Sequence, residues 1–274
     1  MNDKNLDLNS LKNEKLIALL APSFAVMFDY PEIILKLRKL GFDKVVELTF
    51  GAKLVNHEYH KILKNSKKLL ISTVCPGVVE TIKNKYPKFI KNLISVDSPM
   101  VATAKICKRV YPNHKTCFIS PCTFKKIEAR NSDYVDYVID YMELAKLVSN
   151  ISVKGKDNFD MFYNEYTKVY PLSGGLSKTA HLKGIIKPGE EICIDGIVNI
   201  IKFLENPDPK VRFMDVTFCV GGCIGGPYVN SNLDIEGRKK RILDYTKKSS
   251  ALDIPKESKG ILEVAKGIKF KTKY

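Results

Sequence analysis

Short runs of branched apolar residues alternate along the chain with segments of helical periodicity. Residues 15–21 (KLIALLA) predict a buried strand, and residues 31–40 (PEIILKLRKL) predict an amphipathic helix that ends at Gly41. Further strands are expected at 44–49, 68–74, 93–96, 115–120, 135–139 and 212–218, further helices at 52–65, 78–91, 101–110, 142–149, 176–185 and from about 231, and a strand or helix at 192–203. This alternation is typical of α/β proteins with mainly parallel sheets.

The periodicity is lost between about residues 150 and 175, where polar residues, glycine and proline gather. Such a stretch indicates a lobe boundary or a long active-site loop. We therefore expect two lobes of mainly parallel twisted sheet flanked by helices, with the functional site in the cleft between them. The first lobe is expected at 15–150 and the second at 151–255, between a flexible N-terminus at 1–14 and a loosely packed tail at 256–274.

Composition narrows the class of protein. With 274 residues, of which 45% are hydrophobic and 27% charged, the chain can bury a sizeable core. The N-terminus lacks the basic region of a secretory signal, and the longest apolar runs, such as 16–22, are far shorter than the roughly 18 residues of a membrane span. We expect a cytoplasmic protein without membrane contact. In that reducing compartment, seven cysteines indicate free or metal-bound thiols rather than a disulfide framework.

The charge is strongly positive, because 45 Lys and Arg residues outnumber 30 Asp and Glu residues to give +15. Such an excess favours solubility first and an acidic partner second, whether nucleic acid, anionic lipid or a redox protein. The nucleic-acid interpretation depends only on this charge and on the run RKKR at 238–241, which is more typical of a solvated helix face. Most of the excess is lysine, whereas arginine binds phosphates in a bidentate manner. We expect no nucleic-acid partner.

Three cysteine motifs share one position relative to the predicted strands. They are TVCPG at 73–77, SPCT at 120–123 and CVGGC at 219–223, and in each a cysteine follows the C-terminal end of a strand. The C-terminal ends of parallel strands meet at one crevice, where ligands bind. The sequence therefore predicts that four thiols converge there: Cys75, Cys122, Cys219 and Cys223.

The spacing of these cysteines favours an iron-sulfur cluster over zinc. Two glycines between Cys219 and Cys223 let the backbone approach a large group and donate amides to it. Zinc prefers paired two-residue spacings, and no second pair is present. The alternative is that the four cysteines are small buried hydrophobic residues. Burial is the favoured interpretation for the other three, Cys107, Cys117 and Cys193, which lie inside predicted elements.

From about residue 21 to 227 the chain resembles the catalytic domain of the iron-only (di-iron) hydrogenases. The family motif Thr-Ser-Cys-Cys-Pro-Gly is matched by TVCPG at 73–77, and Pro-Cys-x-x-Lys-Lys-x-Glu-Ala by PCTFKKIEA at 121–129. The motif Phe-x-Glu-Val-Met-x-Cys-x-Gly-Gly-Cys-x-Gly-Gly-Gly is matched, with changes, by FMDVTFCVGGCIGG at 213–226. Weaker similarities are APS at 21–23, SP at 98–99 and GG at 174–175.

The resemblance implies a cofactor and a set of site residues. The four cysteines named above would bind a 4Fe-4S cluster, and Cys223 would also bridge to a two-iron subsite with carbonyl and cyanide ligands. Lys125 would donate a hydrogen bond to a cyanide, as suits a cation beside an anionic ligand. The resemblance also implies contacts to the cofactor from Ala21, Ser23 and Ser98, and a proton-relaying role for Glu128.

Departures from the family pattern are equally informative. Val74 stands where the family has a proton-relaying cysteine, Thr217 where it has methionine, and Met100 where it has glutamine. Ferredoxin-like cysteine runs are absent from the sequence, so we expect electrons from an external acidic ferredoxin or flavodoxin, with hydrogen and protons as substrates.

Two hypotheses remain open at this point. One is an oxidoreductase with weak reversible hydrogen turnover, or a hydrogen or redox sensor, which Lys125 favours. The other is a non-catalytic 4Fe-4S protein without the two-iron subsite, which Val74 and Thr217 favour.

Overall fold

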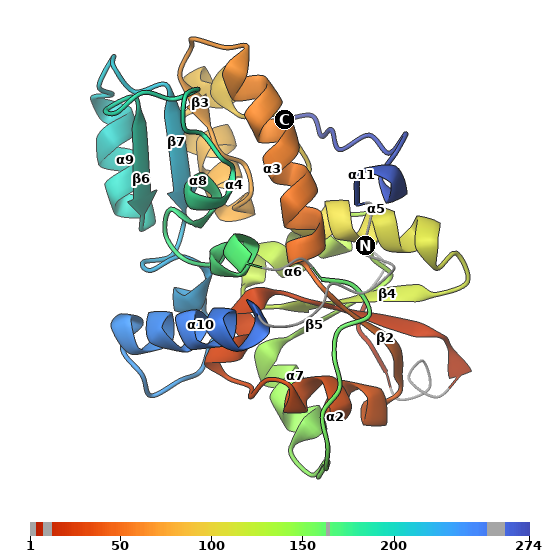
Figure 1. The fold of residues 1–274 in the computed structure, drawn as a ribbon. Helices are drawn as coiled ribbons and strands as arrows, with labels where there is room; N and C mark the ends of the chain where they lie inside the picture. The colour runs from red at the N-terminus through yellow and green to blue at the C-terminus, as the bar shows by residue number, and fades with distance from the viewer. Residues whose placement is uncertain (1–3, 8–12, 163–164, 251–260) are drawn as a thin grey trace.

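The computed structural model describes residues 4–7, 13–162, 165–250 and 261–274, which form two parallel sheets flanked by helices (Figure 1). The first sheet has the strand order β2-β1-β4-β5, with β1 (Leu16–Leu20), β2 (Phe42–Glu47), β4 (Lys115–Ser120) and β5 (Tyr137–Asp140). The second has the order β3-β7-β6, with β3 (Leu70–Ile71), β6 (Glu191–Asp195) and β7 (Phe213–Thr217). All pairings between these strands are parallel, which confirms the predicted α/β class.

The central strand β1 is buried on both faces, since each of its five residues is 0% exposed. A strand covered by helices on both sides needs no polar positions, which explains the continuous apolar run in the sequence. Ile17 and Leu19 pack in the same core cluster as residues of α3 (Thr49–Lys64) and α5 (Pro99–Val110). Leu16, Ala18 and Leu20 pack instead with residues of α2 (Glu32–Leu40) and α7 (Tyr141–Val148).

Local signals explain where several helices begin and end. Gly41 follows α2 with φ of 121°, a conformation that favours glycine. Helix α7 begins with a capping box, in which the Asp140 side chain accepts from the Glu143 amide and the Glu143 side chain accepts from the Asp140 amide. Gly51 permits the close approach of α3 and α5, because a Cβ there would lie 2.2 Å from the Thr103 hydroxyl.

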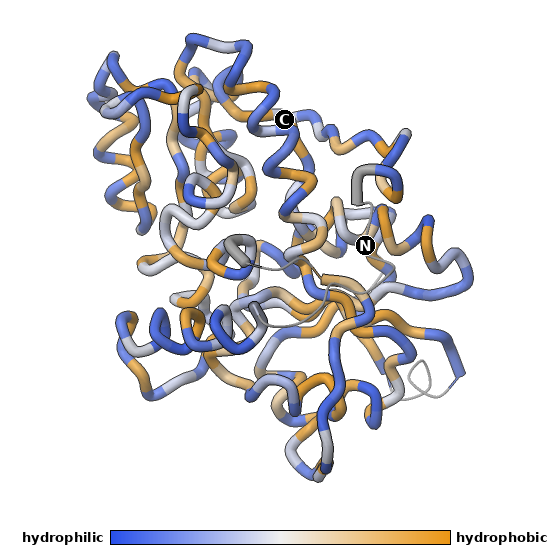
Figure 2. The backbone as a smooth tube through the Cα atoms, in the orientation of Figure 1, coloured by the Kyte–Doolittle hydropathy of each residue, from blue (hydrophilic) through white to orange (hydrophobic). Residues whose placement is uncertain are grey.

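The second sheet has its own core with α4 (Pro76–Lys85) and α9 (Ile197–Glu205). The remaining helices in the described ranges are α6 (Thr123–Arg130), α8 (Gly175–Thr179), α10 (Ile235–Ser250) and α11 (Ile261–Val264). Helix α10 is largely hydrophilic, and only its inner side contributes to the core (Figure 2). Among the described residues, none of the helices combines the length and the apolar character needed to cross a membrane.

Several expected elements differ from the structure, among them the strand expected at 68–74, of which only the two residues of β3 form. The stretch 93–96 makes only an isolated bridge between Leu93 and Ile71, because most of its backbone groups have no neighbouring strand. The ambiguous stretch 192–203 holds both β6 and α9, which Gly196 separates. The helix expected at 176–185 is only the five-residue α8.

The two sheets draw on both halves of the chain. Strand β3 lies within the range expected for the first lobe, yet it pairs with β7 of the second sheet. This pairing crosses the lobe boundary expected at residue 150, and the division of the chain into two lobes at that residue stays a prediction. Much of the N-terminus expected to be flexible, and the first part of the expected tail, lie outside the described residues. Farther along the tail, Ala265 and Phe270 are each 7% exposed and pack in the core cluster that contains α3 and α5.

Candidate metal centre

Each of the four predicted ligands lies at the end of a parallel strand or in the loop that follows it. Cys75 precedes α4, and Cys122 precedes α6 directly after β4. Cys219 follows β7, and Cys223 begins the short 3-10 helix Cys223–Gly225. All four are free thiols of intermediate exposure.

Cys75 and Cys223 line one cavity, Cys122 and Cys219 line one surface hollow, and the four thiols influence one another's ionisation. Burial raises the pKa of Cys223, and the charges of Cys75, Cys122 and Cys219 raise it further. Burial likewise raises the pKa of Cys122 to about 12 and that of Cys219 to about 11, with a contribution from Cys75 in both cases. Neighbouring thiols that oppose each other's ionisation are suited to a cationic metal centre, whose charge reverses this preference.

The surrounding backbone is arranged for sulfur ligands. The amide of Lys125 donates to Cys122 Sγ and the amide of Phe218 donates to Cys75 Sγ, each at 3.4 Å. Gly222 has φ of 83°, and a Cβ there would lie 2.5 Å from the carbonyl oxygen of Pro171. The next amide, that of Cys223, donates to the same oxygen at 2.7 Å. The glycines therefore allow the cysteine loop to lie directly against the segment around Pro171.

Four thiols with amide donors beside them are a donor set that could hold a 4Fe-4S cluster. Within the described ranges, no three His, Cys, Asp or Glu side chains are grouped closely enough to hold one metal ion. A 4Fe-4S cluster separates its thiolate ligands because each binds a different iron, and amides that donate to sulfur are the usual environment of such clusters. Cys75, Cys122, Cys219 and Cys223 would thus hold the cluster.

A small cavity of about 80 Å³ adjoins Cys223. Ala21, Ser23 and Lys125, which the resemblance implied as contacts to the cofactor, all line it together with Val74. Its remaining lining residues are Pro22, Leu48, Thr49, Ala52, Cys75, Pro99, Met100, Phe118, Pro121, Tyr170, Pro171 and Thr217. The cavity is mainly apolar, so charged groups within it act in a medium of low polarity.

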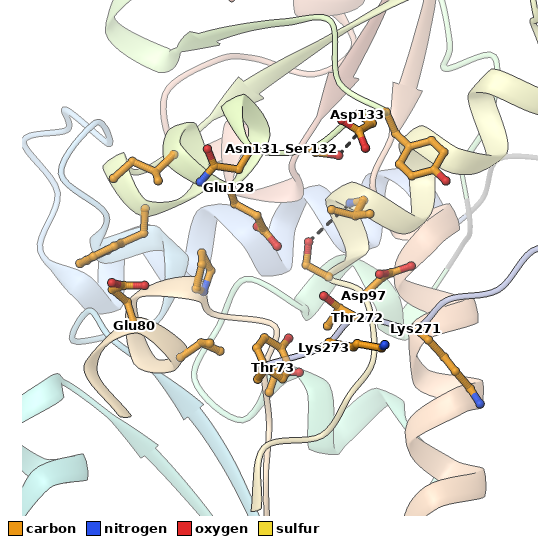
Figure 3. Close-up of a pocket in the computed structure, with 18 of the residues that line it drawn as sticks. Thr73, Glu80, Asp97, Glu128, Asn131, Ser132, Asp133, Lys271, Thr272 and Lys273 are labelled. Atoms are coloured by element: carbon orange, nitrogen blue, oxygen red, sulfur yellow. Dashed lines mark hydrogen bonds between the residues drawn. The ribbon is translucent and has the colours of Figure 1, made fainter. Parts of the chain in front are cut away.

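The other two predicted residues, Ser98 and Glu128, lie in a different and larger pocket of about 640 Å³ (Figure 3). Ser98 there begins α5, and its hydroxyl accepts from the amide of Val101 at 3.4 Å. Burial raises the pKa of Asp97 in the same pocket, although its carboxylate pairs with Lys105 at 2.6 Å. This larger pocket is polar and carries charged groups of both signs.

One ion pair connects the two spaces. Lys125 lines the small cavity and Glu128 lines the larger pocket, and the distance from Lys125 Nζ to Glu128 Oε2 is 2.5 Å. Thr73 and Val74 are likewise consecutive residues that line the larger pocket and the small cavity respectively. The predicted residues thus line two adjoining spaces. Ala21, Ser23 and Lys125 line the small cavity, whereas Ser98 and Glu128 line the larger pocket.

Sequence reasoning missed two tyrosines at the small cavity. The hydroxyl of Tyr141 lies 2.7 Å from Ser23 Oγ and donates to the carbonyl of Ala21 at 3.0 Å, so it fixes that segment. Tyr170 lines the cavity directly. The only signal for Tyr170 was its place four residues before the glycine pair at 174–175, and Tyr141 carried none.

The other cysteines follow the sequence interpretation with one exception. Cys107 and Cys117 are both 0% exposed and serve as core residues. Cys193, which we expected to be buried, is exposed. The reason is the sheet order, because β6 is an edge strand of the second sheet.

Comparisons with known proteins identify relatives of this chain. Residues 14–227 match the family described as "Iron only hydrogenase large subunit, C-terminal domain". Iron hydrogenase 1 of Clostridium pasteurianum is 28% identical over 262 residues, which cover 73% of this chain and 46% of that protein. The cytosolic Fe-S cluster assembly factor NAR1 of Encephalitozoon cuniculi is 23% identical over 228 residues, covering 72% and 62%. The chain thus spans less than two thirds of either relative.

The fold has solved counterparts. A variant of the FeFe-hydrogenase HydA1 from Chlamydomonas reinhardtii superimposes with a TM-score of 0.70 at 18% identity, covering 97% of both chains. A HydA structure described as a step in H-cluster assembly gives a TM-score of 0.67 at 17% identity. Because the family match covers most of the sequence, the chain belongs to the family of C-terminal domains found in the large subunits of iron-only hydrogenases.

Proposed function

We propose that the chain is an iron-sulfur redox protein that binds a 4Fe-4S cluster through Cys75, Cys122, Cys219 and Cys223 and carries a two-iron subsite at Cys223. The observation that supports this most directly is the cavity beside Cys223, since Ala21, Ser23 and Lys125 line it. Lys125 also pairs with Glu128, so the support comes from all three residues lining one cavity beside Cys223.

Each part of the site has a chemical task. When bound, the cluster supplies one-electron transfer and the two-iron subsite supplies the splitting of hydrogen and the reduction of protons. The amides of Lys125 and Phe218 stabilise negative charge on the sulfur atoms of Cys122 and Cys75. The apolar cavity wall excludes bulk water, which strengthens the attraction between the Lys125 ammonium and an anionic ligand.

The small cavity has a poor supply of protons for the proposed two-iron subsite. Val74 lines the cavity and can neither donate nor accept a proton. The loss of one positioned proton donor typically costs about a hundred- to ten-thousandfold in rate. The Lys125–Glu128 pair offers another path: the Lys125 ammonium can release a proton to the cavity and regain one from Glu128, whose Oε2 lies 2.5 Å from Lys125 Nζ and can receive a proton from the larger pocket. We therefore propose slow reversible hydrogen turnover or hydrogen sensing.

Electrons would enter at the opposite side of the cysteines. A surface hollow of about 460 Å³ is lined by Cys122, Cys219 and the 61% exposed Val220, so the outer edge of the thiol group lies close to solvent. An acidic ferredoxin or flavodoxin in the cytoplasm fits both this apolar contact and the net charge of +15. The partner would be steered by lysines and arginines and docked on Val220.

A second candidate is a non-catalytic cluster protein. The similarity to NAR1, a cytosolic Fe-S cluster assembly factor, favours it, as do Val74 and Thr217 at the cavity. Such a protein would bind the 4Fe-4S cluster and leave the cavity beside Cys223 without a two-iron subsite.

Anaerobic reconstitution and maturation with the hydrogenase assembly machinery distinguish the two. Both candidates require about four irons and four sulfides per chain, and serine at Cys75 should alter the cluster spectrum, whereas serine at the buried Cys107 should not. Infrared bands of metal-bound carbonyl and cyanide in the matured protein would support the first candidate. A cluster without such bands would support the second, and a spectrum that depends on Cys107 but not on Cys75 would contradict both.

A further inference from the structure

Two buried hydroxyl groups at the small cavity have no hydrogen-bond partner in the described part of the chain. They are Thr217 Oγ1 and the phenol oxygen of Tyr170, and both residues line the cavity beside Cys223. Thr217 is only 9% exposed. An unsatisfied buried hydroxyl shifts the folding equilibrium by roughly tenfold or more against the native state. Two of them at one cavity therefore point to a ligand that accepts hydrogen bonds.

The other polar groups nearby are already paired. The hydroxyl of Ser23 is engaged with that of Tyr141 at 2.7 Å, and Tyr141 also donates to a backbone carbonyl. Much of the remaining wall is apolar, as at Val74, Met100 and Phe118. The cavity wall thus leaves both hydroxyls without an acceptor, while its volume of about 80 Å³ exceeds what one water needs.

The backbone at Thr217 and at Tyr170 is held in place by the surrounding chain. The amide of Tyr170 donates to the carbonyl of Thr167 at 3.2 Å, and the carbonyl of the following residue, Pro171, accepts from the amide of Cys223. Thr217 ends β7, which is paired on both sides in the second sheet. The backbone that carries both side chains is therefore fixed by main-chain hydrogen bonds.

Charge defines the kind of acceptor. Lys125 lines the same cavity and pairs there with Glu128 of the adjoining pocket, while the described residues that line the cavity itself include no carboxylate. We propose that Thr217 and Tyr170 are hydrogen-bond donors that, together with Lys125, position a small linear anion next to Cys223. This inference deepens the proposed function, because the anion can be a cyanide on a two-iron subsite. A free anion of the same class offers identical chemistry, and the experiment separates these two sources.

The first arm uses azide as the probe on the anaerobically reconstituted four-iron protein, with bound azide followed by infrared spectroscopy. The wild-type protein should bind azide, and Thr217→Val and Tyr170→Phe should each weaken binding about tenfold or more, because each removes one hydrogen bond to an anion. Without azide, neither variant should lower the urea midpoint, since each removes an unpaired hydroxyl.

Matched controls come from hydroxyls that have partners outside the cavity. Thr246→Val and Tyr137→Phe remove hydroxyls bonded to the Ile242 carbonyl and to Glu14 respectively. Both controls should bind azide as the wild-type protein does.

The second arm uses protein matured with the two-iron subsite. Shifted cyanide bands in Thr217→Val and Tyr170→Phe would assign the anion to the subsite, whereas unshifted bands with weakened azide binding would assign the donors to a free anion. If the matured wild-type protein shows no such bands, the proposed two-iron subsite fails, and the azide titration still decides the present inference. The inference would be overturned if the wild-type protein did not bind azide, or if both variants bound azide as the wild-type protein does. Water would then be the hydrogen-bond partner of the two hydroxyls.

Discussion

Lys168→Met tests how strongly a buried ion pair supports the segment that carries Tyr170. Lys168 Nζ lies 2.5 Å from Glu47 Oε2, and the two side chains are 1% and 0% exposed. The ammonium also lies 3.1 Å from the hydroxyl of Tyr245 and 4.9 Å from the centroid of the Phe162 ring. Methionine has a similar length and is apolar, so the substitution removes the charge with little change in packing volume.

The expected cost follows from what Glu47 would lose. Removal of one partner from a buried ion pair typically costs about 3–5 kcal/mol, because the other charge is left buried and uncompensated. The Glu47 carboxylate would retain hydrogen bonds from the hydroxyls of Thr49 and Tyr245, which places the cost near the lower limit, at about 3 kcal/mol. The double variant Glu47→Gln/Lys168→Met removes the stranded charge and should recover about 2 kcal/mol of that loss.

Urea denaturation of the reconstituted protein measures these differences. The matched control is Lys36→Met, which removes a surface pair with Glu32 at 2.9 Å, whose side chains are 24% and 49% exposed. Solvent screens such a pair, so its loss should cost less than about 1 kcal/mol. The reasoning is refuted if Lys168→Met costs no more than Lys36→Met, or if the double variant is no more stable than Lys168→Met alone.

Further predictions concern the site and its supports. In matured protein, Val74→Cys should raise hydrogen evolution at least about tenfold by restoring an acid-base group at the cavity, and an unchanged rate would show that the relay is not limiting. Burial raises the pKa of Asp215 to about 6, so the native carboxyl holds its proton more tightly than the unfolded chain does. Its stabilising contribution is present below about pH 4 and is lost as the pH rises through 6, so Asp215→Asn should gain stability relative to the wild-type protein between pH 4 and pH 7 in urea titrations. Gly222→Ala should lower the free energy of unfolding more than Gly189→Ala does. The two glycines have similar φ values, 83° and 84°, but only at Gly222 would an added Cβ meet a backbone oxygen, that of Pro171. Equal urea midpoints for the two variants would contradict this. The association rate with an acidic ferredoxin should fall steeply with ionic strength in stopped-flow measurements, and a salt-independent rate would exclude steering by the basic surface.

The sequence alone determined the elements that depend on local patterns. The continuous apolar run of β1 and the helix stop at Gly41 follow from side-chain periodicity and backbone preference, which neighbouring residues decide. The nearness of Cys75 and Cys219 could also be predicted, because they follow the neighbouring parallel strands β3 and β7. Cys122 follows β4 of the other sheet, so its place beside them depends on how the two sheets pack. Family motifs added the identity of the expected cluster.

Only the tertiary structure decided which predicted residues share a space. Ser98 and Glu128 carry motif signals like that of Lys125, yet they line a separate pocket, because neighbouring residues of α5 and α6 face different spaces. The assignment of β3 to the second sheet required the long-range pairing with β7, about 140 residues later in the chain.

Long-range polar contacts, and their absence at the cavity, were equally beyond the sequence. The Glu47–Lys168 pair joins positions separated by 121 residues, and the unpaired state of Thr217 and Tyr170 is a property of everything packed around them. Periodicity reports which face of an element is buried, whereas the presence or absence of a hydrogen-bond partner depends on atoms that the whole fold brings within about 3 Å.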